Sequence, residues 1–253
     1  MSNNVSHSLP DSAQYALNRL LISEDPNPLD SVVFGAGGVL TVQGQFRVGR
    51  LLITHGAGAG LDSKMLLAYR EALAAEGVQT LGMEFAYLRE MRKKGRRRPP
   101  PKVECLVSEL AQMCDVLSQV SQVSQSPLWL GGKSMGGRVA SLLAIHRQEV
   151  AGLVLCGYPF HPKGKPETLR LDHWGHLSCP TLVLQGTRDP FGSQVEVEGY
   201  ALPSCATVRW LDDGDHDWQP RRASGLSQAL LVCAAAGETA AFMRQHDGVT
   251  PVG

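Results

Sequence analysis

A serine stands between two glycines directly after an apolar run, and this pattern constrains the fold more than any other part of the chain. Residues 128–131 read Leu-Trp-Leu-Gly, and Gly132, Ser134 and Gly136 then form a Gly-x-Ser-x-Gly pattern. On a sharp turn from strand to helix the serine backbone is strained, and glycines without a Cβ let the turn close. The residues after the serine favour a helix, whose N-terminal dipole stabilises developing negative charge. The pattern therefore predicts a nucleophile elbow in an α/β fold.

A phosphate-binding loop is the main alternative for the same segment, because residues 132–134 read Gly-Lys-Ser. The P-loop pattern requires a first glycine five residues before the second, and Pro127 occupies that position. The spacing therefore argues against nucleotide binding.

An acid and a base follow the serine in the chain order of α/β-type acyl-transfer hydrolases, which is Ser, then Asp or Glu, then His. Asp189 comes just after the apolar run 180–186, and His216 comes after the run 207–211. In this arrangement Asp189 orients His216, and His216 takes the proton of Ser134 and later returns it to the leaving group. We predict a catalytic triad of Ser134, Asp189 and His216.

Other roles for these residues remain open. Asp189 precedes Pro190 and could only start a turn, and the aspartates around His216 could form a solvated loop or a cation site. Their spacing does not match a calcium loop, and no second histidine lies at a metal-ligand spacing beside them. We therefore expect no metal and no cofactor. Three further histidines lie between the serine and the acid, which is the wrong order for the base: His161, His173 and His176.

An oxyanion hole needs two backbone N–H donors, one from the residue after the nucleophile and one from the loop after an earlier strand. Met135 supplies the first. The buried-strand pattern at 50–54 runs into the glycine-rich segment 55–60, where Ala57 is the expected second donor. A dinucleotide-binding turn is the alternative for 55–60, but the segment lacks the full Gly-x-Gly-x-x-Gly spacing.

Taken together, these motifs resemble the α/β-hydrolases, and within them the dienelactone-hydrolase-like group of predicted hydrolases. The chain is also similar to the hydrolase-like subunit of a chromatin-acetylating complex and to a testis-expressed relative. The resemblance covers about residues 50–245. It is carried by the segments 55–60, 83–87, 95–101, 131–138, 157–162, 164–167, 186–192 and 214–217. It implies an α/β-hydrolase fold and hydrolase activity, but no settled substrate.

The amino-acid composition is that of an ordinary globular protein and is consistent with one domain. The 253 residues are 43% hydrophobic and 19% charged, and the formal net charge is zero, so no global field would attract nucleic acid or membrane. Six cysteines without a Cys-x-x-Cys pair, no signal-peptide pattern and no long apolar stretch predict a cytoplasmic protein without a membrane anchor. We expect a polar leader over 1–28, partly flexible, a single domain over 29–245 and a tail over 246–253.

The order of apolar and helical patterns predicts a mostly parallel central sheet flanked by helices. Expected strands cover 31–34, 50–54, 78–85, 128–131, 152–156, 180–185 and 207–211, and expected helices cover 63–76, 103–121, 134–146 and 223–243.

About two dozen residues separate the strands expected at 152–156 and 180–185, which is too few for a lid domain. An open, shallow site suits small acyl substrates. Tyr158 and His161 leave the strand tip on the side of the site, so they are candidates for lining the pocket, as is His55, although simple loop packing would explain them equally well.

Residues 89–102 carry eight basic residues and one acid, and three prolines end the run at 99–101. Such a segment is usually a solvated loop. It is also a candidate site for an anionic ligand or a protein partner, with Arg96 and Arg97 as binding residues, whereas nucleic acid is disfavoured because no aromatic residues are interleaved.

Two functions remain. The first is a serine hydrolase that cleaves small carboxylic esters or thioesters through an acyl-serine intermediate. The second is a non-catalytic interaction module that binds a partner through 89–102. A complete Ser, Asp and His set in the expected order favours the first.

Overall fold

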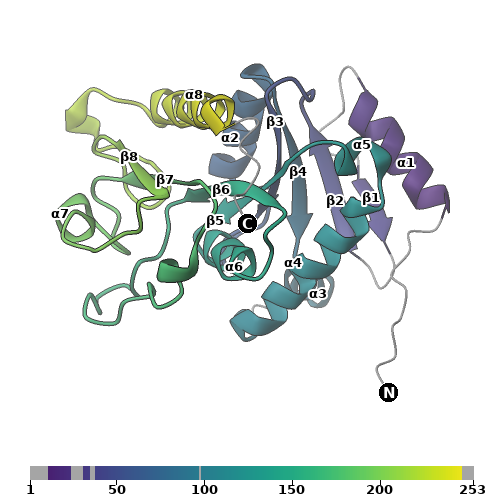
Figure 1. The fold of residues 1–253 in the computed structure, drawn as a ribbon. Coiled ribbons are helices and arrows are strands. Elements are labelled where there is room, and N and C mark those ends of the chain that lie inside the picture. Colours follow the sequence, from purple (N-terminus) through teal and green to yellow (C-terminus); the bar gives the residue numbers. More distant parts are fainter. Residues whose placement is uncertain (1–10, 24–30, 35–37, 97, 247–253) are drawn as a thin grey trace.

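The computed structural model describes residues 11–23, 31–34, 38–96 and 98–246, and in them an eight-stranded sheet forms the centre of the molecule (Figure 1). The strand order is β1-β2-β4-β3-β5-β6-β7-β8. Strands β3 to β8 run parallel to one another. At one edge β2 pairs with β4 in antiparallel orientation, and β1 pairs with β2 in antiparallel orientation. The strands are β1 Ser31–Phe34, β2 Gly38–Gln43, β3 Gly49–Thr54, β4 Val78–Glu84, β5 Leu128–Lys133, β6 Val150–Cys156, β7 Thr181–Gly186 and β8 Ala206–Leu211.

The central strands are buried because helices cover both faces of the sheet. Helices α2 (Lys64–Ala75) and α8 (Gln228–His246) pack against each other on one face. On the other face lie α1 (Asp11–Ile22), α4 (Val103–Ser118) and α6 (Met135–Ala144). All residues of β3 and β4 are buried, as a parallel sheet covered on both sides requires.

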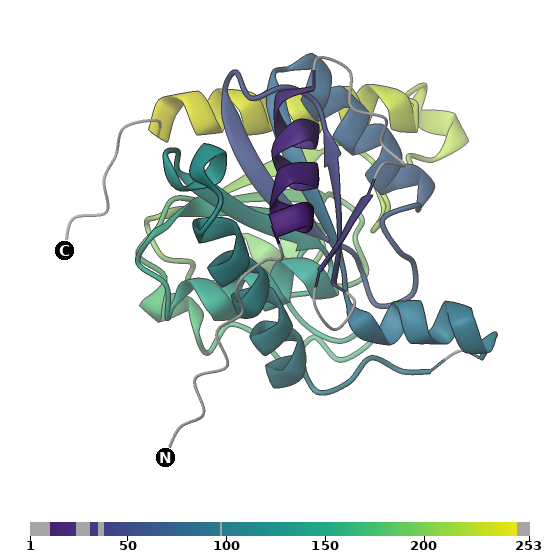
Figure 2. The same ribbon diagram turned by 90° about the vertical axis from the view of Figure 1, so that its right-hand side faces the viewer.

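Shorter helices and turns connect these strands and helices. They are α3 (Ala86–Lys94), α5 (Ser121–Ser124), α7 (Gln194–Val197) and two 3₁₀ turns, Trp174–His176 and Arg222–Ser224. Figure 2 shows α3 projecting from the body of the molecule, next to the chain that leads into α4.

The functional end of the sheet follows from its strand order. Strands β4 and β5 lie on either side of β3, and the helices that follow β3 and β5, α2 and α6, cover opposite faces. At such a switch point the connections diverge and leave a crevice at the carboxyl ends of the strands, which is where ligands bind in open α/β sheets. The segments after β3 and β5 carry Ala57 and Ser134.

The structure adds elements that the sequence analysis did not predict. The leader is not merely polar, because Asp11–Ile22 forms α1, and Leu17 and Leu21 are buried in the core. Strand β2 was not expected from the sequence. The basic run begins within a helix, since α3 extends to Lys94. The leader before residue 11 and the tail from 247 onwards lie outside the described residues, and the domain boundaries stay a prediction.

Candidate active site

Ser134 occupies the turn between β5 and α6, as the elbow pattern predicts. Its backbone has φ 52° and ψ −111°, in the positive-φ region that is costly for a residue with a Cβ. A Cβ on Gly132 would lie 2.5 Å from Thr54 Oγ1, and a Cβ on Gly136 would lie 2.7 Å from the carbonyl oxygen of His55. The two glycines are therefore needed because β3 passes directly behind the turn.

Asp189 and His216 are hydrogen-bonded to each other at the ends of β7 and β8. Asp189 is fully buried, and its Oδ2 lies 2.8 Å from His216 Nδ1. Its second oxygen, Oδ1, accepts a hydrogen bond from the backbone N–H of Phe191 at 2.9 Å. Since a carboxylate only accepts hydrogen bonds, the Nδ1 atom carries the proton. This arrangement leaves His216 Nε2 available as an acceptor.

Lys133 connects the serine turn to the histidine loop. Its Nζ donates a hydrogen bond to the carbonyl oxygen of His216 at 2.5 Å and lies 3.3 Å from Asp217 Oδ1. The side chain is almost fully buried, and burial lowers the pKa of Lys133 although the charges of Asp217 and Asp189 oppose this shift. The residue before Ser134 thus fixes the backbone of the residue that would serve as its base.

Two further neighbours surround the His216 ring. The ring of Phe191, which lines the same cavity as Ser134, lies 4.5 Å from the His216 ring between centroids. Gly157, after β6, leaves room for the histidine, because a Cβ there would lie 3.3 Å from His216 Nδ1. Ser134 Oγ makes no hydrogen bond to any described residue. In ligand-free sites catalytic hydrogen bonds are often long and tighten when substrate binds.

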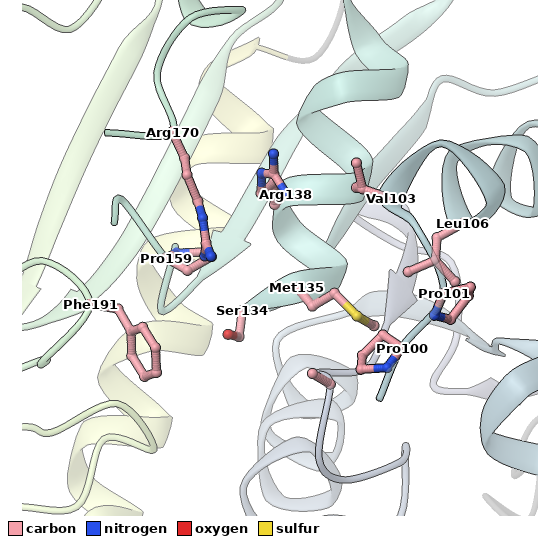
Figure 3. Close-up of a pocket in the computed structure, with 11 residues that line it drawn as sticks. Pro100, Pro101, Val103, Leu106, Ser134, Met135, Arg138, Pro159, Arg170 and Phe191 are labelled. Atoms are coloured by element: carbon pink, nitrogen blue, oxygen red, sulfur yellow. The ribbon is translucent and has the colours of Figure 1, made fainter. Parts of the chain in front are cut away.

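A cavity of about 340 Å³ opens at Ser134 (Figure 3). In the figure Phe191 lies on one side of the serine, Met135 and the Pro100–Pro101 pair lie on the opposite side, and Arg138 and Arg170 lie on a third side. The full lining is Ala57, Pro100, Pro101, Val103, Leu106, Ser134, Met135, Arg138, Pro159, Arg170 and Phe191. The volume is at the lower end of small-molecule sites.

The two expected oxyanion donors, Ala57 and Met135, both line this cavity beside Ser134. Met135 is the first residue of α6, so its N–H has no partner within the helix. Tyr87 fixes the Ala57 segment by donating a hydrogen bond from its hydroxyl to the Ala57 carbonyl oxygen at 3.1 Å. Both residues therefore remain the candidate donors for an oxyanion at the serine.

Comparison with known families agrees with this architecture. Residues 47–244, most of the chain, match the family described as the alpha/beta hydrolase domain. The chain belongs to the alpha/beta hydrolase family. The likeness to the chromatin-complex subunit and to the testis-expressed relative stays a prediction.

Solved structures extend the agreement at the level of the fold. A dienelactone hydrolase from Anabaena variabilis is 21% identical with a TM-score of 0.65, and the match covers 87% of this chain and 98% of that one. A lid-less serine hydrolase from Xanthomonas campestris is 16% identical with a TM-score of 0.62, covering 91% and 99%. An esterase from Pyrococcus furiosus is 12% identical with a TM-score of 0.62, covering 85% and 89%. The expected hydrolase fold without a lid domain is confirmed.

Three residues expected at the pocket of this alpha/beta hydrolase are instead used in packing. His55 is fully buried, and its Nε2 accepts a hydrogen bond from the backbone N–H of Phe85 at 3.1 Å. Tyr158 is also buried, and its hydroxyl donates to the carbonyl oxygen of Arg170 at 3.0 Å. His161 is buried beside Glu196, 3.6 Å from its Oε1. None of the three is among the residues that line the cavity at Ser134, and their contact with substrate stays a prediction.

The basic segment lies apart from the cavity at Ser134, except for its proline end. Arg96 lines a separate hollow formed by α3 and the segment 58–62, and Arg97 lies outside the described residues. Part of the charge is compensated, because Arg92 pairs with Asp62 and Glu84 and Lys94 pairs with Glu90. Whether the segment binds an anionic ligand or a partner stays a prediction.

The aspartates around His216 shape the loop that carries it. Asp213 pairs with Arg188 and Arg221, and Asp215 accepts hydrogen bonds from the backbone N–H groups of Asp217 and Gln219. Within the described residues, no group of three or more histidine, cysteine or acidic side chains is arranged to hold a metal ion. No helix in the described part of the chain is long and apolar enough to cross a membrane. All six cysteines are free thiols.

The sequence analysis missed Arg138 and Arg170 as cavity residues. A signal existed for Arg138, because residues four apart on a helix share a face, so a side chain one turn after Ser134 lies on the same side of α6. Arg170 comes from the irregular segment between β6 and β7, and no periodicity places it. Pro100 and Pro101 were expected only to keep their segment extended, and they form a wall of the cavity.

Proposed function

We propose that this alpha/beta hydrolase is a serine esterase that cleaves small carboxylic esters or thioesters through an acyl-Ser134 intermediate. The proposal rests mainly on one observation, the 2.8 Å hydrogen bond between His216 Nδ1 and the buried carboxylate of Asp189. A buried carboxylate that accepts one bond from a backbone N–H and one from an imidazole is oriented before any substrate arrives. The left-handed backbone at Ser134 supports the same function, because such strain recurs at nucleophile elbows.

In the first half of the reaction Ser134 Oγ attacks the carbonyl carbon of the ester. His216 Nε2 takes the hydroxyl proton as the new C–O bond forms, and the negative charge passes to the carbonyl oxygen. The N–H groups of Met135 and Ala57 are the candidate donors to that oxygen. The tetrahedral intermediate collapses when His216 returns the proton to the leaving alcohol or thiol, which leaves the acyl group on Ser134.

In the second half a water molecule takes the place of the alcohol. His216 removes a proton from the water, the resulting hydroxide attacks the acyl carbon, and collapse of the second tetrahedral intermediate returns the proton to Ser134 Oγ and releases the acid. Asp189 stays ionised throughout and stabilises the imidazolium that forms in each half.

Cavity size supports small substrates. A volume of about 340 Å³, with apolar walls from Pro100, Pro101, Val103 and Leu106, suits a short acyl chain better than a long lipid chain. Esters and thioesters are preferred over amides in this proposal, because their leaving groups need less help from the acid.

Labelling with a fluorophosphonate probe tests the proposal, since this reagent reacts with activated serines. The wild-type protein should be labelled, and Ser134→Ala should not. Ser141, on the same helix, provides a matched control, because Ser141→Ala removes a hydroxyl that does not line the cavity and should leave labelling intact. A series of aryl esters from acetate to decanoate should then show highest kcat/KM for short chains.

Absence of labelling in a folded wild-type protein would contradict the proposal. The non-catalytic interaction module would then be the better description, with residues 89–102 as the candidate surface for a partner.

A further inference from the structure

Two arginines share one side of the cavity that holds Ser134. Arg138 lies one turn into α6 and Arg170 lies in the segment between β6 and β7, and both line the cavity with the serine. In Figure 3 the Arg170 side chain ends beside Pro159, and Arg138 lies on α6 between Arg170 and Val103. Among the described residues that line the cavity, these two alone are charged.

Neither guanidinium group has a partner among the described residues. Arg138 Nε is buried and makes no hydrogen bond, and neither arginine forms an ion pair within the described part of the chain. Burial, and after it the positive charge of Arg138, lower the pKa of Arg170, and the second cause places Arg138 within electrostatic reach of Arg170. Leaving a buried donor without a partner is costly, so natural proteins rarely do so without a reason.

Hydrogen bonds of the backbone hold both arginines in place. The backbone N–H of Arg138 bonds to the carbonyl oxygen of Ser134 at 3.1 Å, so its Cα is fixed relative to the nucleophile. Arg170 is held through its own backbone. Its N–H donates to the carbonyl oxygen of Phe160 at 2.8 Å, and its carbonyl oxygen accepts from the Tyr158 hydroxyl at 3.0 Å. Trp174 Nε1 donates to the same hydroxyl at 3.0 Å, which ties Arg170 to a buried aromatic cluster.

His173, which lies beside Arg138, does not add a further positive charge at neutral pH, and the carboxylate of Asp172 also acts on His173. Its Nε2 lies 2.8 Å from Ser141 Oγ on α6. Burial, and after it the charge of Arg138, lower the pKa of His173 to about 4, so it is neutral at physiological pH. The two guanidinium groups therefore form a pair of adjacent positive charges that faces the cavity.

We propose that Arg138 and Arg170 form an anion subsite beside Ser134 that binds a phosphate group carried by the substrate. Two guanidinium groups match a phosphate in charge, because a phosphate monoester carries about −1.5 to −2 at pH 7. Guanidinium groups also bind phosphate oxygens with paired, charge-assisted hydrogen bonds. The inference deepens the proposed function and rests on it: the substrate is a short-chain ester or thioester whose alcohol or acyl part bears a phosphate.

The rest of the cavity leaves room for this arrangement. Pro100, Val103, Leu106 and Met135 line the side away from the arginines and form an apolar surface for the uncharged end of the substrate. The scissile carbonyl group would then lie at Ser134, between the apolar wall and the phosphate.

Three butyrate esters that share a two-carbon alcohol chain and differ in the neutral or anionic group at its end test the proposal. Their alcohols are 2-methoxyethanol, 3-hydroxypropionic acid and 2-hydroxyethyl phosphate, and release of butyrate is measured by chromatography. For the wild-type protein kcat/KM should be at least about tenfold higher for the phosphate ester than for the neutral ester. Arg138→Gln and Arg170→Gln should each reduce this ratio by about tenfold or more, and Arg170→Lys should reduce it less, since it keeps the charge.

Arginines elsewhere in the chain provide the matched controls. Arg209→Gln removes the same charge from the surface, where Arg209 pairs with Glu238, and it should leave the ratio unchanged. Arg96→Gln removes a charge from the basic segment. If Arg96→Gln lowered the ratio as much as Arg138→Gln, the phosphate would be bound by that segment and the proposal would be wrong. A wild-type ratio near one, or a higher kcat/KM for the carboxylate ester than for the phosphate ester, would also overturn it.

A binding measurement distinguishes a protein that lacks esterase activity from a protein that lacks the anion subsite. If none of the esters is cleaved, calorimetric titration of the Ser134→Ala protein with the phosphate and neutral esters still shows whether the cavity prefers the phosphate group. Tighter binding of the phosphate ester, weakened at least tenfold when Arg138→Gln is added, would support the subsite without catalysis. Equal binding of the two esters would refute it.

Discussion

The two sides of Ser134 differ in how their charged groups are paired. On the side of β7 and β8, both oxygens of Asp189 and the ammonium group of Lys133 have partners within the protein. On another side of the cavity, the guanidinium groups of Arg138 and Arg170 have no hydrogen-bond or ion-pair partner among the described residues. A fully paired group is fixed before substrate arrives, whereas an unpaired one gains its partner from a ligand. Under the two proposals above, the paired groups perform the chemistry and the unpaired groups select the substrate.

The largest effect is expected from Asp189→Asn, which tests whether the paired side is catalytic. The amide keeps the shape of the carboxylate but can donate to His216 Nδ1 and so favours the wrong tautomer. We expect kcat for the short esters to fall about 10³- to 10⁴-fold, with little change in KM. The variant should remain folded by circular dichroism. A loss below about tenfold would show that the hydrogen bond is structural.

A second test concerns His55, whose two ring nitrogens are both hydrogen-bonded to the backbone in a way that requires the neutral imidazole. Burial lowers its pKa to about 4, although the backbone bond to Gly56 opposes the shift, and Nε2 must stay unprotonated to accept from Phe85. Between pH 6.5 and pH 4 the unfolded chain therefore binds more protons than the folded one, and acidification destabilises the fold.

The size of this effect follows from the shift. From pH 7.5 to pH 4.5, His55 should lower the free energy of unfolding by at most about 2–3 kcal/mol, at 1.36 kcal/mol per pKa unit. Urea unfolding at the two pH values measures the loss in the wild type and in His55→Gln, which does not titrate. The variant should lose correspondingly less. Equal losses in the two proteins would mean that His55 is not held neutral.

The smallest of these effects is expected from Lys133→Met, which keeps the buried apolar stem but removes the hydrogen bond to the His216 carbonyl oxygen. A misplaced base costs about ten- to a hundredfold in kcat. Asp217→Asn is the matched control, because it removes only the ion pair and leaves Lys133 bound to His216. It should cost less than about threefold. If both variants lost activity equally, the ion pair rather than the backbone contact would position the loop.

Much of the fold and of the candidate site could be predicted because local rules determine them. Gly132 and Gly136 identify the turn because a Cβ at either position would collide with neighbouring atoms. The apolar runs before Asp189 and His216 predict two strands whose carboxyl ends lie at the same edge of the sheet. The hydrogen bond between the two residues follows from that placement. The helix at the start of the described chain was not predicted, because its short pattern of apolar residues fits a helix and a polar segment equally well. Leu17 and Leu21 have helical spacing, yet the polar residues around them hide a helix that packs on the core.

The pocket was predicted less well than the triad because its walls come from irregular segments. Tyr158 directly follows a strand end, which made it a candidate for contact with substrate, but its ring packs with Phe160 and Trp174 in the core. Arg170, twelve residues later, reaches the cavity in its place. Sequence distance gives no indication of this exchange, because it depends on how the connection between β6 and β7 folds back over α6.

Because of that connection, one wall of the cavity is held by a different segment from the triad candidates. The triad candidates stand on turns at strand ends, but Arg170 stands on a separate segment anchored by the Tyr158–Trp174 pair. Insertions or substitutions between residues 161 and 169 can therefore change what the cavity accepts while the reacting groups keep their geometry. Natural variation in the preferred acid or alcohol among related chains should accumulate in this stretch, and directed evolution of new specificity would begin there at the lowest risk to turnover.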